Sequence, residues 1–366
     1  MRLIVTTDTV GGVWRFTHEL TCELLEMGCS IAMVSFGRQP SEIQKAESHA
    51  LSERWGERFR FVGSDVPLEW MRENTYSFDQ GKAVLEPLAG SFGAELLHSS
   101  QFCFGASTLR IPTVITAHSD VFSWARACRG TSLEESAWLG HYRALVQQGL
   151  SGAGALVAPT EWMLRALRQE FCLPFKQKVI ANGRAVSRRH RRNSKLQAVT
   201  VGRIWDEAKD IAILKEVQSP MPLVVAGDID WDGIQSRRFS GISYRGVLNE
   251  EEILDLFEES AVYVCTSCYE PFGLAPLEAA LCGCAVLARR IDSLREVWCD
   301  AALYFTDAEE LSRLLLQLYE NPAMRIEMQG KARRHAERYS RPRMAQEYLA
   351  LFRSVKGKAT EEERVA

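Results

Sequence analysis

Short apolar runs alternate with amphipathic stretches along the first half of the chain. The runs that we predict as strands are Arg2–Thr6, Ser30–Phe36, Ala94–Leu97, Pro112–Thr116, Ala155–Val157 and Lys178–Ala181. The stretches that we predict as helices are Val13–Met27, one from Ser41 onward, Leu133–Leu150 and Thr160–Phe171. Strands separated by helices of this length predict βαβ units and a parallel sheet. The right-handed crossover rule then favours a doubly wound sheet.

A polar stretch without periodicity, residues 182–194, interrupts this pattern and predicts a linker. Its basic cluster could contact a phosphate or an acidic lipid, but a solvated linker is the favoured interpretation. The cluster consists of Arg188, Arg189, Arg191 and Arg192.

The alternation of strands and helices restarts after this break. The predicted strands are Ala198–Gly202, Leu223–Ala226, Ile242–Tyr244, Ala261–Cys265 and Ala285–Ala288. The predicted helices are Ala208–Val217, Glu250–Glu259, Leu274–Cys282, Ala308–Glu320, Ala323–Arg338 and Pro342–Ser354. A single core rarely exceeds about 250–300 residues, so a chain of 366 residues with this pattern predicts two α/β domains. Ligands of such sheets bind at the carboxyl ends of the strands, which we expect to line a cleft between the domains.

The charge balance gives no indication of bulk electrostatic binding to nucleic acid or to an anionic membrane. The chain has 44 Lys and Arg against 47 Asp and Glu, a net charge of -3. It has no apolar run of 18 residues, and its N-terminus turns polar too early for a signal peptide. We therefore expect a cytoplasmic protein with free thiols, and leave open peripheral contact with the inner face of the membrane.

Two groups of residues have some features of metal sites. Cys265 and Cys268, with Cys282 and Cys284, partly match zinc-ligand spacing, but small buried thiols are the favoured interpretation. The run Asp228, Asp230, Asp232 begins like a calcium loop, yet its twelfth position is Phe239 instead of glutamate. We expect no metal, although the sequence does not decide whether these three aspartates bind one.

Several nucleotide-binding and hydrolytic motifs are absent from the sequence. There is no Walker A loop, no complete dinucleotide fingerprint and no G-x-S-x-G elbow. Gly11 and Gly12 do follow the first strand and precede a helix, where the backbone can approach an anion. Arg203, at a strand end, and Lys209, in the next predicted helix, could neutralise a diphosphate or could be a surface group paired with nearby acids.

The most specific pattern is the run from Tyr269 to Ala280. Glu270 follows a buried strand, Gly273 permits close backbone approach at a helix start, and Glu278 lies in that helix. Two carboxylates so placed can hold hydroxyls of a sugar and a ribose, while the N–H groups of the helix start hold phosphate.

This run resembles the E-x7-E motif of glycosyltransferase family 4, which comprises retaining enzymes with the GT-B fold of two Rossmann-like domains. Further segments are similar to that family along nearly the whole chain, from about Arg2 to Ser354. They are Val10–Val13, Thr116–Asp120 with His118, Ala158–Glu161, Ile180–Gly183, Gly202–Arg203 with Lys209, and Tyr244–Val247. The chain departs from the family after Asn182-Gly183, where Arg184 and Ala185 replace the usual hydrophobic residue and Asp.

The resemblance implies a division of the chain into five parts. It implies an acceptor-side Rossmann-like domain at 1–185, a linker at 186–195 and a domain at 196–338 that binds the nucleotide sugar. It further implies a helix at 339–355 that packs back on the first domain, with a disordered tail at 356–366. Acceptor contacts would come from loops such as 68–78 and 120–132.

The resemblance also implies roles for individual residues. The catalytic set would be His118, Arg203, Lys209 and Glu270, with the two cations replacing a metal ion at the diphosphate. Glu278 would bind the ribose. Donor contacts would come from Gly11, Gly12, Gly246, Val247, Phe272, Gly273 and Leu274. His118 would contact the donor sugar, although a packed core histidine remains an alternative.

The expected function is retaining transfer of a sugar from a nucleotide-diphosphate sugar to an acceptor hydroxyl, in glycan or glycoconjugate biosynthesis. One alternative is a non-catalytic partner protein that only binds the nucleotide sugar. Another is a GT-B epimerase or phosphorylase. The donor base, the sugar, the acceptor (a glycan, a lipid-linked sugar or a small molecule) and the oligomeric state are not determined by the sequence.

Overall fold

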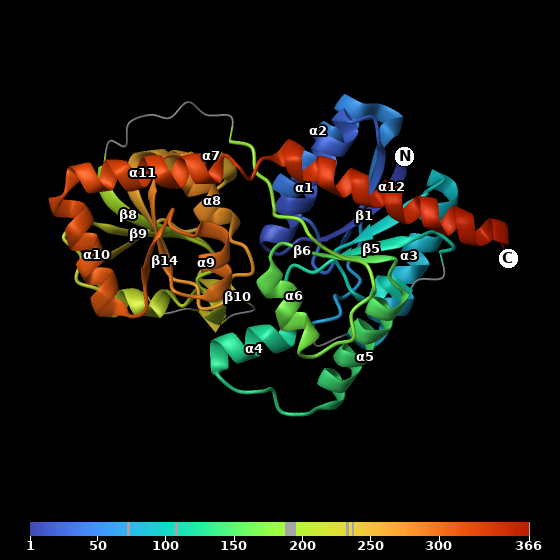
Figure 1. The fold of residues 1–366 in the computed structure, drawn as a ribbon, viewed down its shortest axis with the longest axis horizontal. Helices are drawn as coiled ribbons and strands as arrows, with labels where there is room; N and C mark the ends of the chain where they lie inside the picture. The colour runs from blue at the N-terminus through green and yellow to red at the C-terminus, as the bar shows by residue number, and fades with distance from the viewer. Residues whose placement is uncertain (72–73, 107–108, 187–194, 232–233, 236–237, 366) are drawn as a thin grey trace. The chain divides into compact units, whose positions relative to one another are not determined.

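Two parallel β-sheets organise the chain (Figure 1). The computed structural model describes residues 1–365 except 72–73, 107–108, 187–194, 232–233 and 236–237. It divides into two compact units. Unit 1 comprises Met1–Ser123, Ser132–Gly183 and Arg341–Ala366, and unit 2 comprises Trp124–Thr131 and Arg184–Ser340. Most of the predicted linker, residues 187–194 with its basic cluster, lies outside the described residues.

The sheet of unit 1 has seven strands in the order β3-β2-β1-β4-β5-β6-β7, and every neighbouring pair is parallel. The strands are β1 (Arg2–Asp8), β2 (Ser30–Phe36), β3 (Phe59–Gly63), β4 (Leu96–Ser99), β5 (Thr113–Thr116), β6 (Ala155–Ala158) and β7 (Gln177–Val179). The strand order reverses between β1 and β4. Ligands of open α/β sheets bind outside the carboxyl ends of the strands at such a switch point.

Helices cover both faces of this sheet, as an all-parallel sheet requires. The α-helices of unit 1 are α1 (Gly12–Glu26), α2 (Glu42–Trp55), α3 (Ser77–Phe92), α5 (Ala137–Gly152), α6 (Glu161–Arg168) and α12 (Arg341–Val365), and the 3-10 helices are η1 (Gly56–Arg58), η2 (Asn74–Tyr76) and η3 (Cys103–Ala106). A further helix, α4 (Val121–Arg129), begins in unit 1 but lies mostly in unit 2. Local capping fixes several starts. Ser41 and Gln44 form a capping box at α2, and the Thr160 hydroxyl accepts from the Met163 amide at α6.

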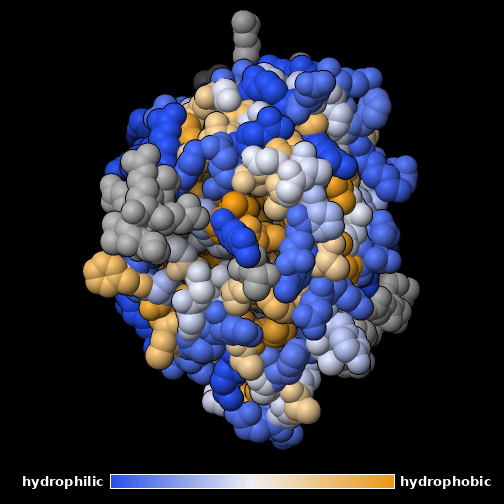
Figure 2. Space-filling model, turned by 90° about the vertical axis from the view of Figure 1, so that its right-hand side faces the viewer, coloured by the Kyte–Doolittle hydropathy of each residue, from blue (hydrophilic) through white to orange (hydrophobic). Residues whose placement is uncertain are grey.

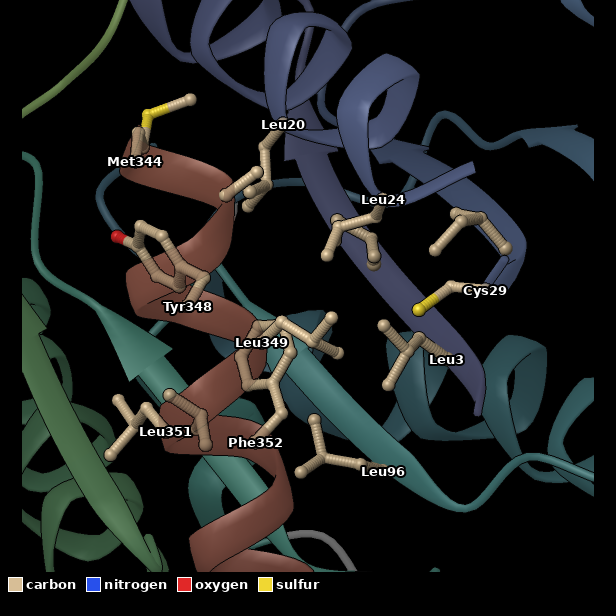
Figure 3. Close-up of a cluster of buried hydrophobic side chains, with 14 of the residues drawn as sticks. Leu3, Leu20, Leu24, Cys29, Leu96, Met344, Tyr348, Leu349, Leu351 and Phe352 are labelled. Atoms are coloured by element: carbon tan, nitrogen blue, oxygen red, sulfur yellow. The ribbon is translucent and has the colours of Figure 1, made fainter. Parts of the chain in front are cut away.

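The last helix, α12, completes the core of unit 1 (red in Figure 1). Tyr348 and Phe352 are fully buried and pack in one cluster with Leu3 of β1 and with Leu20 and Leu24 of α1 (Figure 3). At the start of α12, the guanidinium of Arg341 pairs with Glu19 and Glu23 of α1. The end of the chain is therefore part of the unit in which the chain begins.

The sheet of unit 2 repeats the same pattern with six parallel strands in the order β12-β9-β8-β13-β14-β15. The strands are β8 (Lys195–Val201), β9 (Leu223–Ala226), β12 (Ile242–Tyr244), β13 (Ser260–Cys265), β14 (Ala285–Arg289) and β15 (Leu303–Phe305), and a separate hairpin joins β10 (Asp230–Trp231) to β11 (Ile234–Gln235). Here the order reverses between β8 and β13, so these strands mark the switch point of unit 2.

The helices of unit 2 are α7 (Glu250–Glu259), α8 (Leu274–Leu281), α9 (Asp292–Trp298), α10 (Ala308–Glu320) and α11 (Pro322–Ala336), with the 3-10 helices η4 (Glu207–Lys209) and η5 (Ile211–Glu216). Asn249 and Glu252 form a capping box at α7, and Asn321 caps α11 ahead of Pro322. The predicted α/β class with two doubly wound parallel sheets is confirmed.

Three local predictions were wrong. The helix expected at Ala208–Val217 is two 3-10 helices, because Asp210 has a left-handed backbone (φ 39°) and pairs with the Arg289 guanidinium. The expected loop 120–132 contains α4. The tail 356–366, expected to be disordered, continues α12 as far as Val365, since good helix formers such as Lys, Ala and Glu outweigh its single glycine.

The surface shown in Figure 2 is mostly hydrophilic, with hydrophobic residues in small areas near the middle of that face. Among the described residues, no helix is both long enough and apolar enough to cross a membrane.

Candidate active site

The glycine turn of unit 1 follows β1 at the switch point. Gly11 (φ 76°) precedes the first residue of α1, Gly12, and both are exposed. The Asp8 carboxylate shapes the turn by accepting from the Val10 amide at 2.8 Å. No side chain caps α1, so the N–H groups of its first turn can bind an anionic or hydroxyl-bearing group.

His118 follows β5 and is only partly exposed. Its ring packs edge-on against Phe16 of α1, with centroids 4.5 Å apart, and its Nε2 lies 3.4 Å from the Ser100 hydroxyl beyond β4. Burial lowers the pKa of His118 to about 3. The imidazole is therefore neutral near pH 7, and can donate or accept a hydrogen bond without carrying a charge.

The predicted cations of unit 2 lie just beyond β8, and each already holds a carboxylate. Arg203 Nη2 is 2.5 Å from Asp206 Oδ2, and Lys209 Nζ is 2.5 Å from Glu270 Oε2. Burial is the largest single effect on the pKa of Lys209 and lowers it, but the charge and hydrogen bond of Glu270, together with Cys265, outweigh burial, so the pKa is raised. Both side chains are therefore cationic at the switch point, and the Arg203 side chain is 38% exposed.

Glycines bring the ends of β8, β9 and β12 close together. Gly227 (φ 140°) follows β9, and a Cβ there would lie 1.7 Å from the Gly202 carbonyl oxygen. Its amide donates to the Gly246 carbonyl at 2.7 Å, beside Val247, which is 73% exposed. A side chain at Gly227 would force this junction apart, so glycine is required there.

The loop from β13 to α8 carries Glu270 and is tied to η4. The Cys268 amide donates to the Ala208 carbonyl at 2.9 Å, and the Ser267 hydroxyl lies 3.4 Å from Glu270 Oε2. Gly273 (φ 94°) then starts α8, and a Cβ there would lie 2.8 Å from Pro276 Cγ. Hydrogen bonds thus hold Glu270 against Lys209.

The three predicted ligands that follow Glu270 differ in the groups that they can offer to a ligand. The Phe272 side chain is buried in an edge-on contact with Tyr339, with centroids 5.4 Å apart. Phe272 can therefore offer a ligand only its backbone. Gly273 and Leu274 form the start of α8, where N–H groups have no partner within the helix.

Glu278 lies in α8 with its side chain 13% exposed, and its Oε1 accepts from Arg184 Nε at 2.7 Å. The same guanidinium pairs with Glu250 at the start of α7. Burial raises the pKa of Tyr263 on β13, and the charges of Glu270 and Glu278 contribute to this shift. Both carboxylates of the E-x7-E run therefore lie close enough to Tyr263 to affect the pKa of its hydroxyl.

The four candidate cysteines form no recognisable metal site in the part of the chain that the structure describes. The described residues include no cluster of three or more His, Cys, Asp or Glu side chains suited to a metal ion. Cys265, Cys282 and Cys284 are buried, and burial raises the pKa of Cys265 to about 11. In the aspartate run, Asp232 lies outside the described residues.

Two family models match successive stretches that together span most of the chain. "Glycosyltransferase Family 4" matches residues 10–188, and "Glycosyl transferases group 1" matches residues 209–335. The chain belongs to glycosyltransferase family 4. The first stretch contains the Gly11–Gly12 turn and His118, and the second contains Lys209 and the E-x7-E run, whereas Arg203 lies between the two stretches.

This family 4 chain is similar to two Escherichia coli proteins over part of its length. It is 29% identical to serotype-specific mannosyltransferase WbdA over 138 residues, which are 34% of this chain and 17% of WbdA. It is 29% identical to O-antigen chain mannosyltransferase B over 134 residues, 34% of this chain and 35% of the relative. The matches therefore span well under half of either relative.

The family 4 chain also has the fold of solved glycosyltransferase structures. Sucrose-phosphate synthase from Thermosynechococcus elongatus superposes with a TM-score of 0.77 at 15% identity, covering 98% of this chain and 100% of the other. Anabaena HepE in complex with UDP-glucose has a TM-score of 0.73 at 16% identity, covering 97% and 100%. At this identity the similarity establishes the GT-B fold alone.

Two residues of the unit 2 site were not among the predicted ligands. Gly227 shapes the junction of three strands, and Arg184 holds Glu278. The sequence did contain an indication that Arg184 differs from the family pattern, since it replaces the usual hydrophobic residue after Asn182-Gly183.

Proposed function

We propose that this chain transfers a sugar from a nucleotide-diphosphate sugar to an acceptor hydroxyl, with retention at the anomeric carbon and without a metal ion. The observation that carries the proposal is the Lys209–Glu270 ion pair at the switch point of unit 2, with Arg203 beside it, in a chain of family 4. Cations placed where phosphate charge develops supply the stabilisation that other transferases obtain from a metal.

Arg203 and Lys209 bind the diphosphate in this proposal. The phosphate oxygens take the place of the carboxylates of Asp206 and Glu270, which hold the two cations 2.5 Å away in the structure. Charge-assisted hydrogen bonds strengthen as the leaving group gains charge, so they favour the transition state over the ground state. The N–H groups at the start of α8, from Gly273 and Leu274, add donors to the same diphosphate.

In this proposal Glu270 and Glu278 contact different parts of the donor, the transferred sugar and the ribose. Glu270, once released from Lys209, accepts hydrogen bonds from hydroxyls of the transferred sugar and steadies positive charge at its anomeric carbon. Glu278 binds the ribose, and the exposed turn at Gly246 and Val247 borders the base.

The residues of unit 1 act as uncharged contacts. The neutral imidazole of His118 binds a hydroxyl of the donor sugar, and the turn at Gly11 and Gly12 offers backbone N–H groups. In the reaction, the bond from the anomeric carbon to the phosphate oxygen breaks and a bond to the acceptor oxygen forms on the same face. The proton of the acceptor hydroxyl passes to the departing phosphate, so no separate base is required.

The relatives suggest which donors to test. HepE was solved with UDP-glucose, and both Escherichia coli relatives are named mannosyltransferases. UDP-glucose and GDP-mannose are therefore the first donors to offer, with an ADP-sugar as a third. Acceptors of glycan or glycoconjugate biosynthesis fit the proposal, and the cytoplasm is the proposed compartment.

Release of nucleoside diphosphate tests the proposal without a known acceptor. Each donor is incubated with the protein in EDTA, with water alone or with a deproteinised cell extract that supplies acceptor hydroxyls. We expect release from one donor, increased by the extract. Glu270→Gln keeps the shape of the side chain but removes its charge, so it should lower the rate by about 100-fold. Glu216→Gln, at an exposed position in η5, is the matched control.

Three results would count against parts of this proposal. Binding of a donor without any release would favour a non-catalytic binding protein. Full activity of Glu270→Gln would remove the assigned role of that carboxylate. Loss of release in EDTA that Mn²⁺ restores would favour a metal site, for which the Asp228–Asp232 run is the first candidate.

A further inference from the structure

Arg184 is a buried cation at the edge of the proposed donor site. It is the first residue of the main segment of unit 2, Arg184–Ser340, and only 4% of its surface is exposed. Its amide donates to the Tyr339 carbonyl at 3.0 Å, which fixes the backbone from which the side chain extends. A buried guanidinium is stable only when carboxylates or other acceptors compensate its charge.

Two helices supply that compensation. Arg184 Nε donates to Glu278 Oε1 of α8 at 2.7 Å, and Nη2 donates to Glu250 Oε1 at the start of α7. The planar guanidinium presents its donors in a fixed fork, so two bonds in different directions define where each carboxylate lies. Lysine, with a single charged nitrogen on a flexible stem, would not hold both carboxylates in this way.

The arrangement leaves half of the Glu278 carboxylate for a ligand. Oε1 is taken by Arg184, and no described residue donates a hydrogen bond to Oε2. Glu278 is 13% exposed, so it is not sealed in the core. A carboxylate with one oxygen anchored and the other available is suited to accept from a hydroxyl in a fixed direction.

We propose that Arg184 is a positioning residue that sets the preference of the donor site for a ribose with free 2′ and 3′ hydroxyls, by orienting Glu278. The inference rests on the proposed function, in which Glu278 binds the ribose. Without Arg184, two carboxylates, Glu278 and Glu250, would face each other without a shared cation. Repulsion would then turn Glu278 away from its position for the ribose.

The alternative is that Arg184 only joins α7 to α8. The two roles predict different binding patterns. A structural loss weakens all nucleotides together, whereas loss of Glu278 positioning weakens only those nucleotides that have ribose hydroxyls.

Calorimetric titration distinguishes these roles. UDP, GDP and ADP are titrated into the whole protein, and the best ligand is compared with its 2′,3′-dideoxy analogue. We expect the wild type to prefer the ribonucleotide by 10-fold or more, since hydrogen bonds to a charged group are strong. In Arg184→Met we expect that preference to fall below about 3-fold while affinity for the dideoxy analogue is unchanged. Arg313→Met, which alters a 63% exposed arginine side chain of unit 2, should keep the wild-type preference.

Further variants keep the test decisive if Arg184→Met does not fold. Glu250→Gln removes one anchor of Arg184 and leaves Glu278 in place, so we expect it to lower the ribose preference in part. Arg184→Lys should lie between the wild type and Arg184→Met. An unchanged preference in a folded Arg184→Met, or in Glu250→Gln if only that variant folds, would overturn the inference. The inference would also be overturned if the wild type bound the ribonucleotide and its dideoxy analogue equally. Equal weakening of the binding of both ligands in Arg184→Met would overturn it as well. If no nucleotide binds the wild type at all, the proposed function itself fails.

Discussion

At the scale of single residues, burial and pairing decide which groups carry charge. Arg203 and Lys209 of unit 2 each have an acidic partner, and His118 of unit 1 is held neutral. A second histidine, His98 of β4, is fully buried, and its Nε2 lies 2.8 Å from the Thr116 hydroxyl. Arg203 and Lys209 of unit 2 are therefore charged near pH 7, whereas His118 of unit 1 is neutral.

The buried histidines predict a pH dependence of stability. Burial, with a smaller effect of His118, lowers the pKa of His98 from 6.5 to about 3. Between these values the unfolded chain binds more protons than the folded one, so stability falls as the pH is lowered below 6.5. At pH 5 the loss from His98 is about 2 kcal/mol.

Urea unfolding at pH 7 and pH 5 measures this dependence. His98→Gln cannot be protonated, so its stability should change by about 2 kcal/mol less than that of the wild type over this interval. His49→Gln, at a side chain that is 73% exposed, should behave like the wild type. An equal pH dependence in His98→Gln would show that His98 is not held neutral.

At the scale of elements, long apolar runs were easier to predict than short or interrupted ones. The strand Ser30–Phe36 and the helix Ala308–Glu320 were predicted with the bounds that the structure gives them. The helix α9 and the partly exposed edge strand β3 were not predicted: α9 has only seven residues, and Arg60 interrupts the apolar run of β3. The break at Asp210 depends on Arg289, which is 79 residues away and could not be read from the local pattern.

The helix α12 gives a prediction at this scale. Phe352→Ala removes a fully buried ring from the cluster of unit 1, which should lower the free energy of unfolding by about 3–5 kcal/mol. Phe175→Ala makes the same chemical change at a fully exposed ring in the same unit and should have little effect.

Hydrogen exchange followed by mass spectrometry localises the effect. Peptides from β1 and α1 should exchange faster in Phe352→Ala, whereas peptides from β13 and α8 of unit 2 should be unchanged. Equal acceleration in both units, or none in either, would contradict the assignment of α12 to the core of unit 1.

At the scale of the whole molecule, the six-stranded order of unit 2 repeats that of the first six strands of unit 1. In both units candidate residues follow strand ends, Gly11 after β1 and His118 after β5 in unit 1, and Arg203 after β8 and Glu270 after β13 in unit 2. The two sheets and most of these residues could be predicted from the sequence, because each motif consists of a strand end and the loop that directly follows it. The pairing of Arg184 was not predictable, since its partners lie 66 and 94 residues further along the chain. What the local pattern cannot supply is the set of tertiary partners.

The central claim is that the two cations of unit 2 bind a nucleotide diphosphate without a metal. Titration calorimetry in EDTA with UDP, GDP and ADP tests it most directly, on the wild type, Lys209→Met and Lys215→Met. Lys215 is an exposed lysine in η5 and serves as the control. We predict that at least one diphosphate binds the wild type and Lys215→Met equally and binds Lys209→Met about 10- to 100-fold more weakly. Equal affinity in Lys209→Met, or binding by the wild type only when Mn²⁺ is added, would contradict the account.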